Sequence, residues 1–196
     1  PLAAISGTYT PGTHGCIFTI TPTTSVIVPV GPIYYSAVID GTSYSETADV
    51  NTYANEFGLT GGSDVILSSG IVVSASPPPA NSTEFYIRKG ILHSYGSSMS
   101  NVTFKAFFST GTYGYGASPN DGIEIQWIDE AGNNWSTNNG TAIQTGSNFN
   151  ITSVEDEPGQ AQYSVRVKAT FNCRLYDGAG NEKILTNGQF TGVFAK

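Results

Sequence analysis

QYSVRVKATFNCRLY, residues 162–176, alternates between apolar and polar side chains without an error through residue 175. Every odd position from Tyr163 to Leu175 is apolar, and every even position from Gln162 to Arg174 is polar. Successive side chains of a β-strand point to opposite faces, whereas a helix cannot place a period of two on one face. The stretch therefore predicts a long strand with one side in a core and the other side in water.

Turn signals divide the rest of the sequence into hairpins. The turn Asp177–Asn181 (DGAGN) leads into a second run, Glu182–Ala195, which predicts a long β-hairpin. Asp129–Asn133 (DEAGN) resembles that turn, and we interpret the pair as one hairpin chemistry used twice, because Asp, Gly and Asn suit turns with positive φ. Asp40-Gly41 predicts a third hairpin between residues 33–39 and 43–47. Further strands are predicted at residues 15–21, 24–30, 64–69, 71–76, 84–93, 101–109, 122–128, 134–137 and 148–154.

The helical candidate is residues 46–57, where Val50, Tyr53, Ala54 and Phe57 recur at i, i+3, i+4 and i+7. Residues 1–32 are rich in Thr, Pro and Gly, which favours edge strands or an extended arm. We therefore expect an all-β protein: an antiparallel β-sandwich, Ig-like or jelly-roll-like, with at most one short helix near residues 46–57. The expected organisation is an N-terminal arm over residues 1–32 and a single domain over residues 33–196.

The composition indicates where the protein is located and disfavours some classes of partner. The 196 residues are 39% hydrophobic but only 12% charged, and Gly, Ser, Thr, Asn and Tyr are abundant. This balance is typical of exported all-β proteins, so we expect a secreted or cell-surface location. The net charge of −7 and the absence of a basic cluster disfavour nucleic acid and anionic membranes as partners. No apolar run in the sequence is long enough for a transmembrane helix.

The two cysteines, Cys16 and Cys173, both fall on apolar faces of predicted strands. One interpretation is a disulfide that joins the first strand to a late one, as between the sheets of some sandwiches. The other is two buried free thiols that pack as small hydrophobic side chains. The sequence leaves both open, because it does not give the distance between the two Cα atoms.

Three acidic residues, Glu155, Asp156 and Glu157, are consecutive in a predicted loop. Clustered carboxylates can supply oxygen ligands to calcium, and extracellular calcium is abundant enough to fill weak sites. The other interpretation is a solvated acidic loop. Calcium is therefore the one cofactor that the sequence suggests.

Aromatic residues suggest a second candidate site. Tyr113, Tyr115 and Trp135 fall in or near predicted loops, where exposed rings on a β scaffold could stack on sugar rings. Packing at the edge of the core is the other interpretation. The sequence contains neither a Gly-x-Ser-x-Gly nucleophile elbow nor the His and Cys spacings of zinc sites, so we expect no enzymatic activity.

Parts of the sequence resemble exported β-sandwich domains of Bacteroidetes-type bacteria, many of them surface lipoproteins without an assigned function. The matching segments are VKATF (167–171), DGAGN (177–181), ILTNGQF (184–190) and, near the start, AVIDGTSY (37–44). The resemblance covers about a quarter of the chain. It implies a fold and a location, and it carries no catalytic residues. Lipid anchoring is not implied, because no cysteine stands at or next to Pro1.

These observations favour a structural or adhesive protein that assembles with copies of itself into a cell-surface or extracellular fibre. The N-terminal arm could add a strand to the open sheet edge of a neighbour, with main-chain hydrogen bonds supplying the affinity. The alternative is a surface module that binds carbohydrate through Tyr113, Tyr115 and Trp135. A hydrolase has no constellation of residues to support it.

Overall fold

The computed structural model describes residues 5–12, 15–22, 31–116, 122–139 and 143–196, with side chains from residue 31 onward. Contacts between Cα atoms divide the chain into two compact units, Pro1–Gly31 and Pro32–Lys196. In the first unit, β1 (Ile5–Gly12) and β2 (Gly15–Pro22) pair antiparallel as a hairpin, from Ile5 opposite Pro22 to Gly12 opposite Gly15. The expected strand at residues 24–30 lies outside the described residues.

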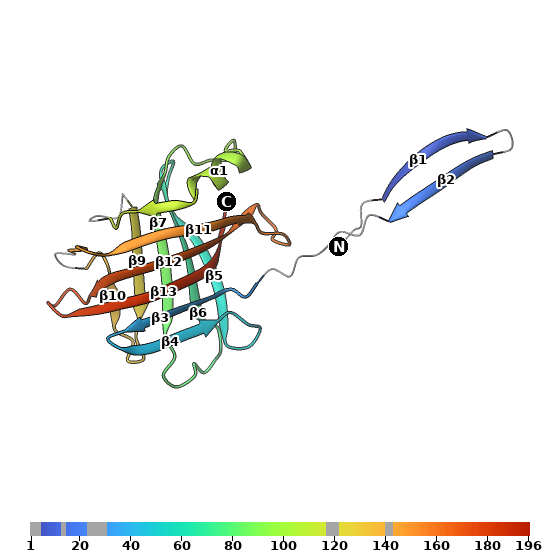
Figure 1. The fold of residues 1–196 in the computed structure, drawn as a ribbon. Coiled ribbons are helices and arrows are strands. Elements are labelled where there is room, and N and C mark those ends of the chain that lie inside the picture. Colours follow the sequence, from blue (N-terminus) through green and yellow to red (C-terminus); the bar gives the residue numbers. More distant parts are fainter. Residues whose placement is uncertain (1–4, 13–14, 23–30, 117–121, 140–142) are drawn as a thin grey trace. The chain divides into compact units, whose positions relative to one another are not determined.

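The second unit contains an eleven-stranded sheet that curls on itself (Figure 1). Its main path runs β4-β3-β13-β12-β10-β9-β7-β6-β5, and β11 branches from β12 and pairs with β8. Its strands are β3 (Tyr34–Ile39), β4 (Thr42–Thr47), β5 (Tyr53–Gly61), β6 (Val65–Val73), β7 (Glu84–Leu92), β8 (Gly111–Tyr113), β9 (Gly122–Ile128), β10 (Asn134–Ser136), β11 (Asn148–Asp156), β12 (Ser164–Tyr176) and β13 (Glu182–Ala195). The all-β prediction is confirmed, whereas a division into two sandwich sheets is not shown.

The long C-terminal hairpin forms as predicted. Strands β12 and β13 pair antiparallel from Ser164 opposite Ala195 to Tyr176 opposite Glu182. In the turn between them, the Asp177 carboxylate accepts hydrogen bonds from the backbone N–H groups of Ala179 and Asn181. The carboxylate of Asp129 accepts the same two bonds in the earlier turn, from residues 131 and 133. The interpretation of one turn chemistry used twice is therefore confirmed.

An aromatic core lies between the strands. In Figure 1, the strands β11, β12, β13 and β3 cross in front of β9, β7, β6 and β5. The side chain of Phe85 on β7 stacks on Tyr35 of β3 at 4.7 Å between ring centroids. Phe171 of β12 lies 5.6 Å from Phe85 and 5.7 Å from Phe149 of β11. Rings from four strands thus join the front of the sheet to the back.

The predicted helix at residues 46–57 is wrong. Strand β4 runs to Thr47, and β5 begins at Tyr53. Between them the Asp49 carboxylate accepts hydrogen bonds of 2.6 Å from the backbone N–H groups of Asn51 and Thr52. Asp side chains favour such turns because they offer the backbone an alternative to helical bonding. Val50, expected on the buried face of the helix, is 96% exposed.

The predicted strand at residues 101–109 is also wrong, because these residues form the helix α1 (Asn101–Phe107). Ser100 caps the helix by accepting a hydrogen bond from the backbone N–H of Thr103 at 3.0 Å. Phe104 and Phe108, four residues apart, are both buried, and Phe108 packs 4.6 Å from Phe194 of β13. The helix therefore closes the core beside the end of the chain (Figure 1).

Candidate functional sites

Two of the proposed calcium ligands are engaged with basic residues. Glu155 lies 3.4 Å from Lys168, and Asp156 lies 2.9 Å from Lys105. Hydrogen bonds from Ser153 and then Lys168 lower the pKa of Glu155, and the hydrogen bond from Lys105 is the largest cause of the lowered pKa of Asp156. Each carboxylate thus has its own counter-charge, Lys168 on β12 for Glu155 and Lys105 on α1 for Asp156.

The third proposed ligand, Glu157, forms a buried ion pair. Its two carboxylate oxygens accept hydrogen bonds from Nε and Nη2 of Arg166 at 2.6 and 3.0 Å. The side chains of Arg166 and Glu157 are only 5% and 9% exposed. Within the described part of the chain, no group of three or more His, Cys, Asp or Glu side chains is placed to hold a metal ion. A calcium site at Glu155, Asp156 and Glu157 stays a prediction.

The three aromatic candidates for sugar binding pack against the chain itself. The Tyr113 hydroxyl donates to the backbone oxygen of Ser109 at 2.5 Å. The Tyr115 hydroxyl lies 2.9 Å from the backbone oxygen of Asn172, and burial raises the pKa of this phenol. Trp135 is 9% exposed, and its Nε1 donates to the Asp129 carboxylate at 2.9 Å. A glycan site at Tyr113, Tyr115 and Trp135 is untested and stays a prediction.

The cysteines lie in different units. Cys173 on β12 is a buried free thiol, and burial raises the pKa of its sulfhydryl group. Cys16 lies on β2, and its side chain is outside the described residues. A disulfide between the two stays a prediction.

Open strand edges are a candidate assembly site. The main path of the large sheet ends at β4 on one side and at β5 on the other. Among the described strands, β1 and β2 pair only with each other, so both outer sides of that hairpin are edges as well. Such edges present unpaired backbone N–H and C=O groups to any strand that can lie alongside them.

A buried lysine on β7, Lys89, is a feature that sequence reasoning missed. Phe85, Ile87 and Lys89 alternate along β7 and are all buried, so the period-two rule applied from Phe85 would have placed Lys89 inside. The residue is 6% exposed. Its Nζ lies 3.9 Å from the ring centroid of Phe107 and 4.4 Å from that of Tyr113. Burial lowers the pKa of this amine to about 8.

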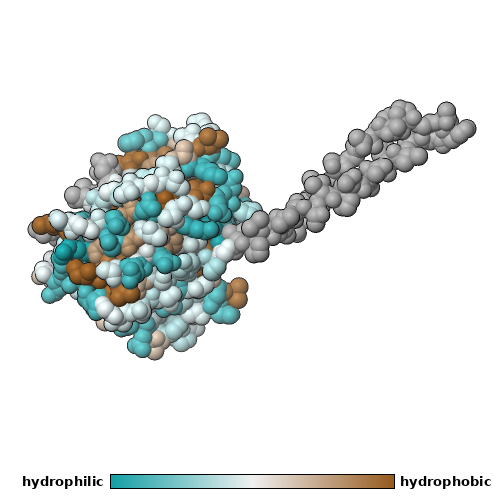
Figure 2. All heavy atoms as spheres, viewed as in Figure 1, coloured by the Kyte–Doolittle hydropathy of each residue, from teal (hydrophilic) through white to brown (hydrophobic). Residues whose placement is uncertain are grey.

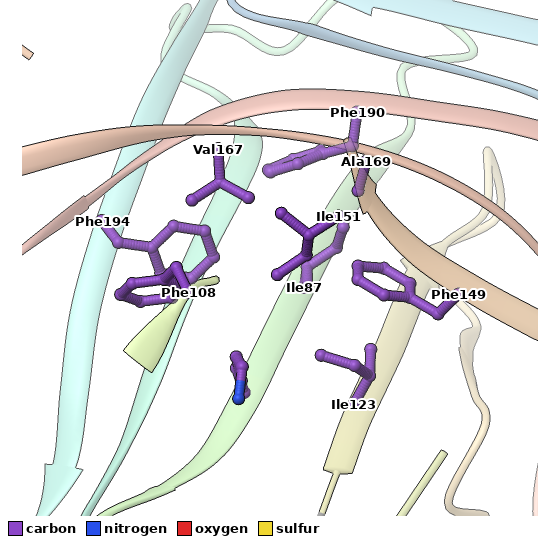
Figure 3. A pocket seen from close by; sticks show the side chains of 10 residues that line it. Ile87, Phe108, Ile123, Phe149, Ile151, Val167, Ala169, Phe190 and Phe194 are labelled. Carbon is purple, nitrogen blue, oxygen red and sulfur yellow. The ribbon is translucent and has the colours of Figure 1, made fainter. Parts of the chain in front are cut away.

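Lys89 borders an apolar pocket that is lined by β7, β9, β11, β12 and β13 and by Phe108, just after α1. The other lining residues all have hydrocarbon side chains, among them Ile87, Ile123, Phe149 and Phe190 (Figure 3). The free space at the centre is about 10 Å³, roughly enough for one water molecule. The pocket is therefore almost filled by its own lining, which is apolar throughout, because the amine of Lys89 lies against Phe107 and Tyr113 outside the pocket.

No protein-family model matches the chain, and no curated protein and no solved structure matches it either. In the described residues, no helix combines the length and the apolar character needed to cross a membrane. The resemblance to Bacteroidetes-type surface domains stays a prediction.

Proposed function

We propose that this chain is a non-enzymatic, exported structural protein that assembles with copies of itself by strand addition. In the assembly, the β1–β2 hairpin of one copy lies along the β5 edge of another. The observation that carries the proposal is that β1 and β2, eight residues each, form a two-stranded sheet of their own. An isolated two-stranded hairpin is at best marginally stable in water, so a third strand beside it would supply the missing stabilisation.

The edge at β5 suits this hairpin better than the edge at β4. Strand β5 is nine residues long and keeps an unbroken register with β6, whereas β4 has six residues. An added strand can pair with β5 from Glu56 to Gly61, beyond Asn55, whose side chain accepts a hydrogen bond from β13. Leu59 on β5 is 44% exposed and offers an apolar contact to an added strand. On the face drawn in Figure 2, hydrophobic side chains lie in small groups among hydrophilic ones.

For the fold itself, we infer an orthogonal sandwich. The backbone N–H of Val193 on β13 donates to the side chain of Asn55 on β5 at 2.9 Å, so the β5 end of the curled sheet meets β13, the third strand from the other end. In orthogonally packed sheets, the strands of one layer cross those of the other layer at a steep angle. The two layers are joined by strands that pass from one to the other.

Deleting residues 1–31 should abolish self-association while the remaining unit stays folded. The hairpin would be lost, but the aromatic core of residues 32–196 would be untouched. Sedimentation velocity over a concentration series measures association, and circular dichroism during heating measures folding. A truncated chain that melts cooperatively and still associates like the full chain would rule out the hairpin mechanism.

Leu59→Lys should weaken self-association by at least about tenfold, because a lysine on an edge strand opposes pairing with another strand. The matched control is Ser45→Lys, which places the same charge at an exposed position on the opposite edge, β4. Dissociation constants from the same sedimentation experiment decide between the edges. If only the Ser45 variant lost self-association, the docking site would lie at β4, which would contradict the proposal for β5.

A further inference from the structure

An open, polar hollow lies on the outer face of β12 and β13, which is drawn in Figure 2. Its volume is about 390 Å³, within the range of roughly 300–1,000 Å³ that ligand sites occupy. Five of its seven lining residues carry an uncharged amide or hydroxyl side chain: Asn148, Thr170, Asn172, Asn187 and Gln189. The other two are the buried Phe171 and Gly188, so polar groups dominate what a ligand would meet.

The hollow lies at an irregularity of the sheet. Opposite the single residue Asn172 of β12, the neighbouring β13 has two residues, Thr186 and Asn187. The register between β13 and β3 shifts at the same place. Asn187 has a φ of 52°, in the left-handed region that Asn adopts more readily than most residues. Such bulges re-aim side chains and are over-represented next to functional sites.

Two of the amides are held by their oxygen atoms, which leaves their N–H groups to donate. Oδ1 of Asn172 accepts a hydrogen bond from the backbone N–H of Asn148 at 2.7 Å. Oε1 of Gln189 accepts one from the Tyr34 hydroxyl at 3.0 Å. Within the described part of the chain, the amide nitrogens of Asn172 and Gln189 donate to no other group, and the side chain of Asn187 forms no hydrogen bond. Oriented donors are therefore available to a ligand in the hollow.

The charge of the lining decides the class of ligand. None of the seven residues that line the hollow is charged. A phosphate or carboxylate ligand is bound most strongly by cationic side chains, and a hard metal ion by carboxylates. Sugar hydroxyls both donate and accept hydrogen bonds, as the amide and hydroxyl side chains of the hollow do. The lining therefore suits a neutral ligand that is rich in hydroxyl groups.

Two smaller hollows continue the first one along β12. The nearer shares Asn172 with it, and the farther shares Arg174 with the nearer and reaches Tyr176. The charge of Arg174 is compensated by its ion pair with Glu182. The six steps from Thr170 to Tyr176 span about 20 Å, at about 3.3 Å per residue of strand. The row of hollows is therefore longer than one sugar ring and suits a chain of several.

We propose that this row of hollows binds a neutral polysaccharide, whose hydroxyl groups accept hydrogen bonds from the amides of Asn172 and Gln189 and pair with the hydroxyl of Thr170. The site is independent of strand addition, because none of its lining residues lies on β1, β2 or β5. It also differs from the glycan site predicted from aromatic residues of the sequence, because none of those three residues lines it.

The test is affinity electrophoresis of the full-length chain in native gels, each containing one soluble polysaccharide. The neutral probes are laminarin, xyloglucan, galactomannan, arabinoxylan and pullulan, and the anionic probe is alginate. We expect at least one neutral polysaccharide to retard the chain, and alginate to leave its mobility unchanged. The mobility over a series of polysaccharide concentrations gives a dissociation constant.

A double variant locates the site. Thr170→Val and Gln189→Ala together remove two hydrogen-bonding groups from exposed positions and should weaken binding by at least about tenfold. The matched control is Gln162→Ala, which removes an exposed amide just before β12, outside the hollows, and should bind like the original chain. Circular dichroism during heating shows whether each variant folds.

Three outcomes would overturn the proposal. The first is a chain that none of the neutral polysaccharides retards, and the second is retardation by alginate alone. The third is a folded double variant that binds no more weakly than the Gln162 control, because the polysaccharide would then lie elsewhere on the chain. If the double variant does not fold, Asn187→Gly decides instead, since it removes an amide from the hollow and glycine adopts the same positive φ. Unchanged binding by that variant would equally contradict the site.

Discussion

Replacing Glu157 with Ala should lower the free energy of unfolding by about 3–5 kcal/mol. The substitution leaves the buried guanidinium of Arg166 without the carboxylate that accepts its two hydrogen bonds of 2.6 and 3.0 Å. A buried charge that loses its partner keeps its desolvation cost and loses the Coulombic compensation. Urea unfolding followed by circular dichroism measures the change, and Glu157→Gln, which keeps the shape, should show a smaller loss.

The matched control for this prediction is Glu155→Ala, two residues earlier. Glu155 pairs with Lys168 at 3.4 Å, but the two side chains are 55% and 42% exposed. Exposed pairs contribute at most about 1 kcal/mol, so this variant should be nearly as stable as the original chain. Equal losses in the two variants would contradict the structural role of the buried pair. If calcium stabilised the original chain and neither variant, the calcium prediction would gain its first support.

The same ion pair shows where sequence periodicity stops being informative. The alternation in residues 162–176 correctly placed Val165, Val167, Phe171 and Leu175 in the core. It also assigned Arg166 to the solvent face, yet this side chain is 5% exposed. Period two tells which face a residue occupies, but not what covers that face. Here Glu157, beyond the end of β11, covers the N-terminal end of the polar face.

The predictions for residues 46–57 and 101–109 were wrong because local hydrogen bonding, rather than periodicity, determines the structure there. Phe104 and Phe108 satisfy both a period of two and a helical spacing of four, so the pattern alone could not separate strand from helix. Ser100 was the available signal, because serine is a preferred N-cap. In residues 46–57 the helical spacing was present, but Asp49 ties the backbone into a turn.

The candidate sites were predictable to different degrees. The inward position of Lys89 follows from alternation along β7, but the rings against its amine lie on other elements, α1 and β8. The edge at β5 depends on strand order, which the sequence does not give. Conversely, Trp135 was expected in or near a loop, whereas β10 places it opposite Trp127 and at 9% exposure. Properties of single strands are local, whereas pockets and edges belong to the whole sheet.

Phe85→Ala should cost about 3–5 kcal/mol of unfolding free energy, because it empties the centre of the core. Phe85 is fully buried, stacks on Tyr35 at 4.7 Å, and lies 5.6 Å from Phe171 and 6.1 Å from Phe190. These rings come from strands on the front and the back of the curled sheet, so their loss leaves a cavity that neither side can fill alone. Urea unfolding measures the change.

The control for this core prediction is Phe57→Ala, on the open edge strand β5. Phe57 is half-buried and belongs to none of the stacked pairs around Phe85, so we expect a loss of about 1 kcal/mol or less, in line with partial removal of apolar burial. Phe85→Leu keeps most of the volume and should lie between the two. Similar losses for Phe85→Ala and Phe57→Ala would mean that the aromatic stack does not hold the layers together. The curled sheet would then depend on its hydrogen-bonded ladders and on the closure between β13 and β5 instead.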